Sequence, residues 1–130
     1  MFRIILALII SLIFCSSAFA MNIFIEGVNV PVEWENNKSV HALEELLPLT
    51  VRMHSYGGFE QVGSIGKSLP RNDKNLTTSA GDIVLYSGNQ IVIFYGSNTW
   101  AYTKLGRVTD KSKLELLKQD NVTLKIEAAQ

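Results

Sequence analysis

No group of side chains in this 130-residue sequence has the types and spacing of a known catalytic site. The nearest candidate is His41, which lies one helical turn before Glu45 on a short predicted helix. Such a pair is an ordinary contact on a solvated helix face, worth about 0.3 kcal/mol, and no third group follows that would orient His41 as a general base. Catalytic triads, phosphate-binding loops and metal-ligand spacings are also missing from the sequence. We therefore predict no catalytic residues.

Cysteine chemistry is confined to the N-terminal apolar stretch, because Cys15 is the only cysteine. Residues 21–130 have no thiol that could form a disulfide, bind a metal ion or act as a nucleophile. We therefore expect no metal site and no cofactor, and we expect the fold to be stabilised by packing alone.

The first 20 residues are typical of a secretory signal peptide. Arg3 precedes an apolar stretch from Ile4 to Phe14, and small residues follow up to the motif Ala18-Phe19-Ala20. This stretch is shorter than the roughly 18 to 20 residues that span a bilayer. We expect cleavage after Ala20 and export to the periplasm or the extracellular space, with residues 21–130 as one domain.

Two alternatives concern the same N-terminal region. Cys15 would suit bacterial lipidation, but Phe14 occupies the preceding position, where such sites have a small residue. Met21 directly follows the predicted cleavage site, so initiation at Met21 would produce a cytosolic protein with the same fold.

The composition indicates one globular domain that has no charged surface for nucleic acid. The hydrophobic content is 47% and the charged content 18%, which is enough apolar material for a single core. Lys+Arg and Asp+Glu are equal at 12 each, without long runs of one sign. The sequence therefore predicts no basic surface of the kind that binds nucleic acid or anionic membranes.

The elements that would hold a binding site are centred on residues 81–108. Ile83 to Tyr86 and Ile91 to Tyr95 are apolar runs joined by the turn Ser87-Gly88-Asn89-Gln90. This pattern predicts a tight hairpin that is buried on both faces. Most of the aromatic residues outside the N-terminal stretch also lie in this region, so it is expected to form the centre of a β core.

Alternating apolar residues predict further strands on both sides of this hairpin. They lie within Asn22 to Trp34, which bends at Glu26-Gly27, and within Leu49 to His54, Trp100 to Val108 and Val122 to Glu127. Pro31 has no backbone N–H and is expected at an edge or a bulge.

Two short helices are predicted between these strands, at Ser39 to Leu47 and at Lys111 to Gln119. Phe59 to Leu69 is predicted to be irregular, and Pro70 to Ala80 to be an exposed loop. Together the elements predict a mainly β, largely antiparallel closed barrel whose ends are covered by the helices.

The order of several short motifs resembles the bacterial cyclophilin-like fold family, small single-domain proteins without assigned activity. The resemblance covers nearly all of Asn22 to Glu127 and rests on Leu46-Leu47-Pro48-Leu49, Gly66-Lys67-Ser68-Leu69-Pro70, Ala80-Gly81-Asp82, Ile93-Phe94-Tyr95 and Leu105-Gly106-Arg107-Val108. It implies the cyclophilin β-barrel, with about eight antiparallel strands and two capping helices.

The resemblance also implies where a ligand would bind. Peptidyl-prolyl isomerases of this fold hold a twisted X-Pro bond with an arginine, an aromatic and apolar floor, and a glutamine and a tryptophan at the rim. The loosely matching residues here are Arg52, Phe59, Gln90 and Trp100. The isomerase run Phe-His-Arg is replaced by Thr50-Val51-Arg52, and the Gly-Gly-Asp segment that follows it is missing.

We therefore expect a binding module without catalytic residues, which holds a peptide segment or a small apolar ligand. Its groove is predicted to be lined by Arg52, Tyr56, Phe59, Gln90 and Trp100. Two alternatives remain open: the protein could be a weak peptidyl-prolyl isomerase, and the aromatic residues could simply belong to the core.

Overall fold

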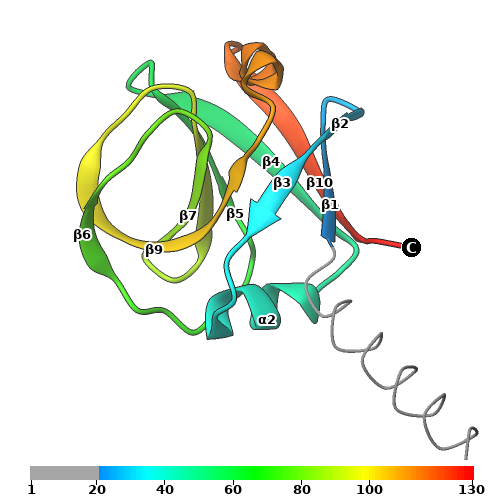
Figure 1. Ribbon diagram of the computed structural model, residues 1–130, viewed down its shortest axis with the longest axis vertical. Helices are drawn as coiled ribbons and strands as arrows, with labels where there is room; N and C mark the ends of the chain where they lie inside the picture. Colours follow the sequence, from blue (N-terminus) through cyan, green and yellow to red (C-terminus); the bar gives the residue numbers. More distant parts are fainter. Residues whose placement is uncertain (1–20) are drawn as a thin grey trace, which may run out of the picture.

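The computed structural model describes residues 21–130, which form an antiparallel β-barrel (Figure 1). The predicted signal peptide, residues 1–20, lies outside the described residues. Nine strands follow the order β2-β1-β10-β4-β5-β8-β7-β9-β3, and β6 pairs with β9 beside this path. The strands are β1 (Met21–Ile25), β2 (Val28–Val30), β3 (Val32–Trp34), β4 (Leu49–Tyr56), β5 (Glu60–Ser64), β6 (Lys74–Thr77), β7 (Asp82–Tyr86), β8 (Gln90–Phe94), β9 (Thr99–Val108) and β10 (Asn121–Ala128).

The barrel is closed by one bent strand. β2 and β3 stand at the two ends of the strand order, yet only Pro31 separates them in the chain. Pro31 cannot donate to a ladder, so the strand changes partner there, from β1 to β9. When β2 and β3 are counted as one strand and β6 is left aside, the barrel has eight strands, the number that the family resemblance implies.

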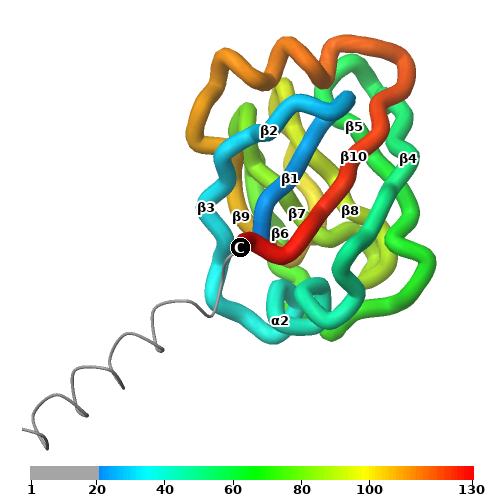
Figure 2. The backbone as a smooth tube through the Cα atoms, turned by 90° about the vertical axis from the view of Figure 1, so that its right-hand side faces the viewer, coloured from blue at the N-terminus to red at the C-terminus, as the bar shows by residue number. Residues whose placement is uncertain are grey.

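Two short helices lie at opposite ends of the barrel (Figures 1 and 2). They are α2 (Lys38–Glu44) and the 3-10 helix η2 (Lys111–Leu117). The Asn37 side chain caps α2 by accepting from the backbone N–H of Val40 at 2.9 Å. The helix ends before the predicted Leu47, because the chain tightens into a turn in which the N–H of Leu46 donates to the Leu43 carbonyl at 3.0 Å. The predicted architecture of a barrel with two capping helices is confirmed.

Two segments that were predicted to lack regular structure are strands. β5 lies in the region that was expected to be irregular because of its glycines. A Cβ atom on Gly63 would lie 2.6 Å from the Arg52 carbonyl oxygen, so this glycine permits close packing of β4 rather than breaking a strand. β6 lies in the expected loop, where its polar residues pair with the first half of β9 from Thr99 to Tyr102. Pairing with an available strand here outweighs weak local propensity.

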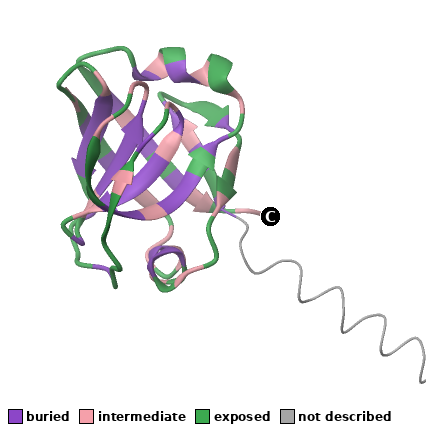
Figure 3. Cartoon of the chain, turned by 60° about the vertical axis from the view of Figure 1, so that its left-hand side comes forward, coloured by how far each residue is buried: buried purple, intermediate pink, exposed green. Residues whose placement is uncertain are grey.

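The central hairpin β7–β8 is buried on both faces, as predicted. Ile83, Leu85, Ile91 and Ile93 belong to the main core inside the barrel. The alternate residues Val84, Val92 and Phe94 form a second cluster with Val62 and Tyr102 on the outer face of the same strands. In Figure 3 the buried residues continue along the strands that cross the middle of the barrel, whereas the outer loops are exposed.

The outer cluster is partly covered by β6 and the first half of β9. These two strands are paired and lie at the left edge of the molecule in Figure 1. Leu76 from β6 packs against the outer cluster. Neither helix within residues 21–130 has the length and apolar character needed to cross a membrane.

Candidate binding site on the outer face of the barrel

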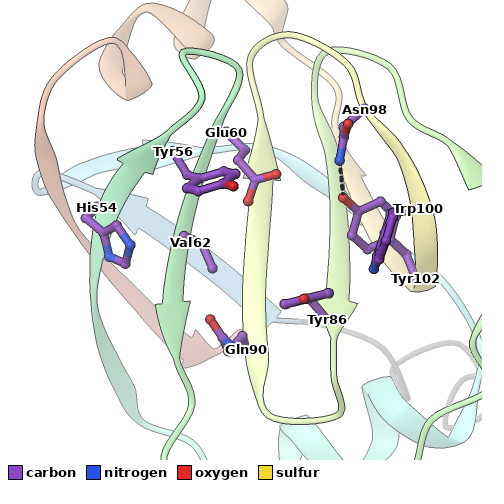
Figure 4. Close-up of a pocket in the computed structure, with 9 residues that line it drawn as sticks. All are labelled: His54, Tyr56, Glu60, Val62, Tyr86, Gln90, Asn98, Trp100 and Tyr102. Carbon is purple, nitrogen blue, oxygen red and sulfur yellow. Dashed lines mark hydrogen bonds between the residues drawn. The ribbon is translucent and has the colours of Figure 1, made fainter.

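A groove of about 420 Å³ opens on the outer face of the barrel, above the second apolar cluster (Figure 4). One side is formed by β4 and β5, and the other by β7, β8, β9 and the turn before β9. The residues that line it are His54, Tyr56, Glu60, Val62, Tyr86, Gln90, Asn98, Trp100 and Tyr102.

Strand alternation and register decide which side chains meet in this groove. Successive residues of a strand point to opposite faces, so Glu60 faces outward whereas its neighbour Gln61 faces the barrel interior. Tyr56 on β4 is paired with Glu60 on β5, and Glu60 is paired with Phe94 on β8. These three residues therefore form a row across the outer face, although Phe94 is more than 30 residues from the other two in the sequence.

Aromatic rings form a continuous chain beneath and along the groove. Phe59 packs edge-on against Tyr56, with ring centroids 6.0 Å apart, and stacks on Phe94 at 6.4 Å. Phe94 meets Tyr102 at 5.6 Å, and Tyr102 meets Tyr86 at 6.2 Å. Offset-stacked and edge-to-face pairs at these separations are favourable, worth about 1 kcal/mol each, so the groove has a rigid aromatic framework.

Two aromatic side chains at the walls of the groove remain exposed. Tyr56 is 62% exposed and Trp100 is 57% exposed. Figure 4 shows Tyr56 on one side of the groove and Trp100 on the other. Their rings are available to a ligand, unlike the ring of Phe94, which is fully buried.

Glu60 is the main electrostatic feature of the groove. The residue is only 7% exposed, and burial raises the pKa of its carboxyl from 4.5 to about 7. None of the ion pairs within residues 21–130 includes Glu60. A buried carboxylate without a cationic partner is disfavoured relative to its protonated form, so Glu60 exchanges its proton near neutral pH.

The Tyr102 hydroxyl lies in the same hollow. Asn98 Nδ2 donates to this hydroxyl at 2.9 Å, which leaves the phenolic proton free to be donated elsewhere. Burial raises the pKa of Tyr102, and the negative charge of Glu60 raises it further. Tyr102 therefore stays protonated and can act as a hydrogen-bond donor in the groove.

The five residues predicted from the sequence are distributed unevenly around this groove. Tyr56, Gln90 and Trp100 line it. Phe59 lies beneath Tyr56 as part of the aromatic framework and does not line the groove. Arg52 is an exposed residue of β4, about 7 Å beyond His54 along the same face, and it does not line the groove either. The role of these residues in ligand binding stays a prediction.

Sequence reasoning did not place six of the lining residues in the groove: His54, Glu60, Val62, Tyr86, Asn98 and Tyr102. Glu60 follows Gly57-Gly58 in a segment that was predicted to be irregular, so its alternation with Val62 was overlooked. The tyrosines were interpreted as core residues of the central region. The spacing of Trp100 and Tyr102, two positions apart on a predicted strand, was the available signal that both share one face.

The groove offers binding chemistry rather than an assembled catalytic centre. Its components are aromatic faces, an apolar floor, the amides of Gln90 and Asn98, and one carboxyl that changes charge near pH 7. Within the part of the chain that the structure describes, no three His, Asp or Glu side chains are grouped so that they could hold a metal ion.

Comparisons with known proteins agree with this fold. The solution structure of a hypothetical protein from Archaeoglobus fulgidus superimposes with a TM-score of 0.64, covering 87% of this chain and 96% of that chain. The two sequences are 18% identical, so the similarity shows the fold alone. No curated protein matches the chain. The model of the cyclophilin-like family matches residues 23–127, nearly the whole barrel, and the chain therefore belongs to the cyclophilin-like family.

Proposed function

We propose that this protein is a binding module that holds a small apolar ligand or a peptide segment in the groove between β4 and β9. The observation that carries the proposal is the exposure of Tyr56 and Trp100, by 62% and 57%, on two walls of one hollow. Burial of a large apolar side chain contributes roughly 1.5 to 3 kcal/mol to folding stability. Because these two side chains are mostly exposed, they contribute much less than this. Exposed aromatic rings beside a concave apolar floor are typical of binding sites.

The two tryptophans provide a direct test. Trp34 is partly buried in the barrel, where its indole Nε1 donates to the Met21 carbonyl at 3.0 Å, whereas Trp100 lines the groove. The protein is screened by ¹⁵N NMR against a library of small apolar molecules and short proline-containing peptides. We expect a compound that binds to shift the Trp100 indole signal and to leave the Trp34 indole signal in place. Shifts confined to another face, or none across the library, would contradict the proposal.

The alternative function is weak peptidyl-prolyl isomerase activity. Rotation about an X-Pro bond has a barrier of about 18 to 20 kcal/mol, and catalysis requires tighter binding of the twisted amide than of either planar form. A donor misplaced by about 1 Å loses on the order of a hundredfold in rate, and Arg52 lies outside the groove.

A protease-free assay of cis-to-trans relaxation in an X-Pro peptide separates the two functions. We expect neither the parent protein nor Arg52→Ala to accelerate relaxation. Strong acceleration by the parent that Arg52→Ala abolishes would instead establish the isomerase.

We also propose that the protein is exported from a bacterial cell to the periplasm or the extracellular space, with residues 1–20 as a cleaved signal peptide. The support is the composition of those residues: Arg3, an apolar stretch to Phe14 and the motif Ala18-Phe19-Ala20.

A further inference from the structure

The groove carries charge of one sign. Glu60 is the only acidic residue that lines it, and no Lys or Arg is among the residues that do. His54 is the only histidine among the lining residues. Taking a carboxylate out of water without a counter-charge is unfavourable, and a ligand that supplies the missing positive charge would offset this penalty.

Aromatic side chains of the groove lie around Glu60. In Figure 4, Tyr56 lies on one side of Glu60, Trp100 and Tyr102 lie on the other, and Tyr86 lies below. Glu60 is paired with Tyr56 across β4 and β5 and with Phe94 across β5 and β8. The Phe94 ring lies 5.6 Å from that of Tyr102, and Tyr86 and Trp100 line the same groove. Aromatic faces carry negative potential and attract ammonium groups within about 6 Å of the ring centre.

We propose that the groove is a receptor site for an organic cation, in which an alkylammonium group is held between aromatic rings and the carboxylate of Glu60. This inference rests on the proposed binding function and specifies its ligand class. A volume of about 420 Å³ accommodates an ammonium group together with an apolar body. The ammonium group belongs either to a free small amine or to a lysine side chain, and both would use the same contacts.

Proton exchange makes such binding dependent on pH. A cation favours the ionised form of Glu60, whose pKa in the free protein is about 7. The other titratable groups around Glu60 are His54 and Tyr56 from β4, Tyr86 from β7 and Tyr102 from β9. Protonation of His54 would add positive charge and weaken cation binding in the same direction, so a His54→Gln variant is needed to separate the two groups.

Choline and 3,3-dimethyl-1-butanol are a matched pair of probes, since they have nearly the same shape and differ in charge. We expect choline to shift the Trp100 indole signal and to bind about tenfold or more tightly than the neutral alcohol. Trp100→Leu, which keeps an apolar side chain but removes the ring, should weaken choline more than the alcohol, with Tyr56 amide shifts as the readout. Equal affinity for the two probes would overturn the inference.

Glu60→Gln tests the carboxylate. We expect this variant to lose about tenfold or more in choline affinity and to lose much less in affinity for the neutral alcohol. Glu33→Gln is the matched control: it removes the same charge from an exposed residue on β3 that pairs with Arg107 at 3.9 Å, away from the groove. Unchanged choline affinity in Glu60→Gln, or an equal loss in Glu33→Gln, would contradict a specific role of Glu60.

The pH arm compares choline affinity at pH 8 and pH 5. The parent and His54→Gln should both lose more than about tenfold at pH 5, because little of Glu60 is ionised there, whereas Glu60→Gln should change little. A pH dependence that persists in Glu60→Gln and disappears in His54→Gln would assign the effect to His54 and overturn this part of the inference.

The source of the cation is distinguished by a short lysine-containing peptide and its Nζ-acetylated form. Preference for the unmodified peptide over both choline and the acetylated peptide would support a lysine side chain. Preference for choline over the unmodified peptide would support a free amine, and tighter binding of the acetylated peptide than of the unmodified one would contradict the inference. If neutral library compounds shift Trp100 while choline, butylamine and the lysine peptide all fail to bind below about 10 mM, the binding function stands and the cation inference is wrong.

Discussion

At the scale of single residues, Glu60 is the least ordinary side chain in the described part of the protein. Most buried carboxyl groups are paired with a cation or hydrogen-bonded, whereas Glu60 is 7% exposed and takes part in no ion pair within residues 21–130. Residues of this kind, at the edge of a hollow, are more typical of ligand sites than of structural cores. Ionisation of Glu60 is therefore expected to lower the free energy of unfolding.

We predict that the free energy of unfolding decreases as the pH rises from 5 to 8. Because the pKa of Glu60 is about 7 in the folded protein and 4.5 in the unfolded chain, the folded protein binds more protons between these values. The contribution of Glu60 to the free energy of unfolding is therefore most favourable below pH 4.5. This contribution is lost as the pH rises through about 7. Urea unfolding of the parent should show a loss of about 2 kcal/mol across this range.

Glu60→Gln is the control for this pH dependence. The neutral amide cannot titrate, so its unfolding free energy should vary less between pH 5 and 8, and at pH 8 the variant should be at least as stable as the parent. A parent protein whose stability changes with pH in the same way as that of Glu60→Gln would contradict the burial of Glu60.

At the scale of elements, the short helix η2 depends on a strand for its C-terminal hydrogen bonds. The last carbonyls of any helix lack partners within the helix. Here the buried Gln61 of β5 donates its Nε2 to the carbonyls of Leu117 at 2.9 Å and Gln119 at 2.7 Å. One side chain therefore ties the helix to the barrel wall.

Gln61→Ala is predicted to destabilise the protein by about 2 to 3 kcal/mol, because it leaves a cavity and two carbonyls without their donor. Hydrogen exchange should increase first in η2 and then in the start of β10. Gln119→Ala is the matched control, since the Gln119 side chain is exposed and donates only to the Leu116 carbonyl at 2.7 Å, and the substitution keeps the Gln119 backbone carbonyl. Its effect should stay within about 0.5 kcal/mol. Similar losses in the two variants would argue against this link.

At the scale of the whole molecule, the barrel is closed where β3 meets β9, and Gly106 permits that contact. Gly106 is paired with Trp34 of β3 on one side and Ile83 of β7 on the other. A Cβ atom at this position would lie 2.5 Å from the Glu33 carbonyl oxygen and 3.2 Å from the Trp34 Cα. Both neighbours are backbone atoms, so an added methyl group could be accommodated only by separating the strands.

Gly106→Ala is accordingly predicted to lower the free energy of unfolding by about 2 to 3 kcal/mol, with loss of protection in β3 in hydrogen-exchange measurements. Gly58→Ala provides the comparison: its φ of +75° is unfavourable for alanine, but nothing lies within 4 Å of the added Cβ. Its loss should be about 1 kcal/mol. A smaller loss in Gly106→Ala than in Gly58→Ala would contradict the account of closure.

Mass spectrometry of the native protein tests the proposed export. We expect a mature chain that begins at Met21 and is recovered from the periplasm or the medium. A membrane-bound chain that keeps Met1, or a chain that begins at Met21 and stays in the cytosol, would contradict cleavage after Ala20.

The sequence by itself determined the elements whose signal is local. The alternation from Leu49 to His54 and the two apolar runs around Ser87-Gly88-Asn89-Gln90 define their strands without reference to the rest of the chain, because a period of two residues is enough to specify a strand with one buried face. The caps at Asn37 and Asp110 likewise act within a few residues. From these elements and the order of the motifs, the barrel and its two helices could be predicted.

Only the tertiary structure decided β5, β6 and the composition of the groove. β6 exists because β9 extends beyond β7 and offers it a partner, which no local pattern reveals. Glu60 and Tyr102 line one groove because β5, β8, β7 and β9 are neighbours in that order. Arg52 is left outside the groove although it shares a strand with Tyr56. The physical reason is that strand alternation assigns a residue to a face, whereas the register between strands distant in the sequence decides which residues on that face meet.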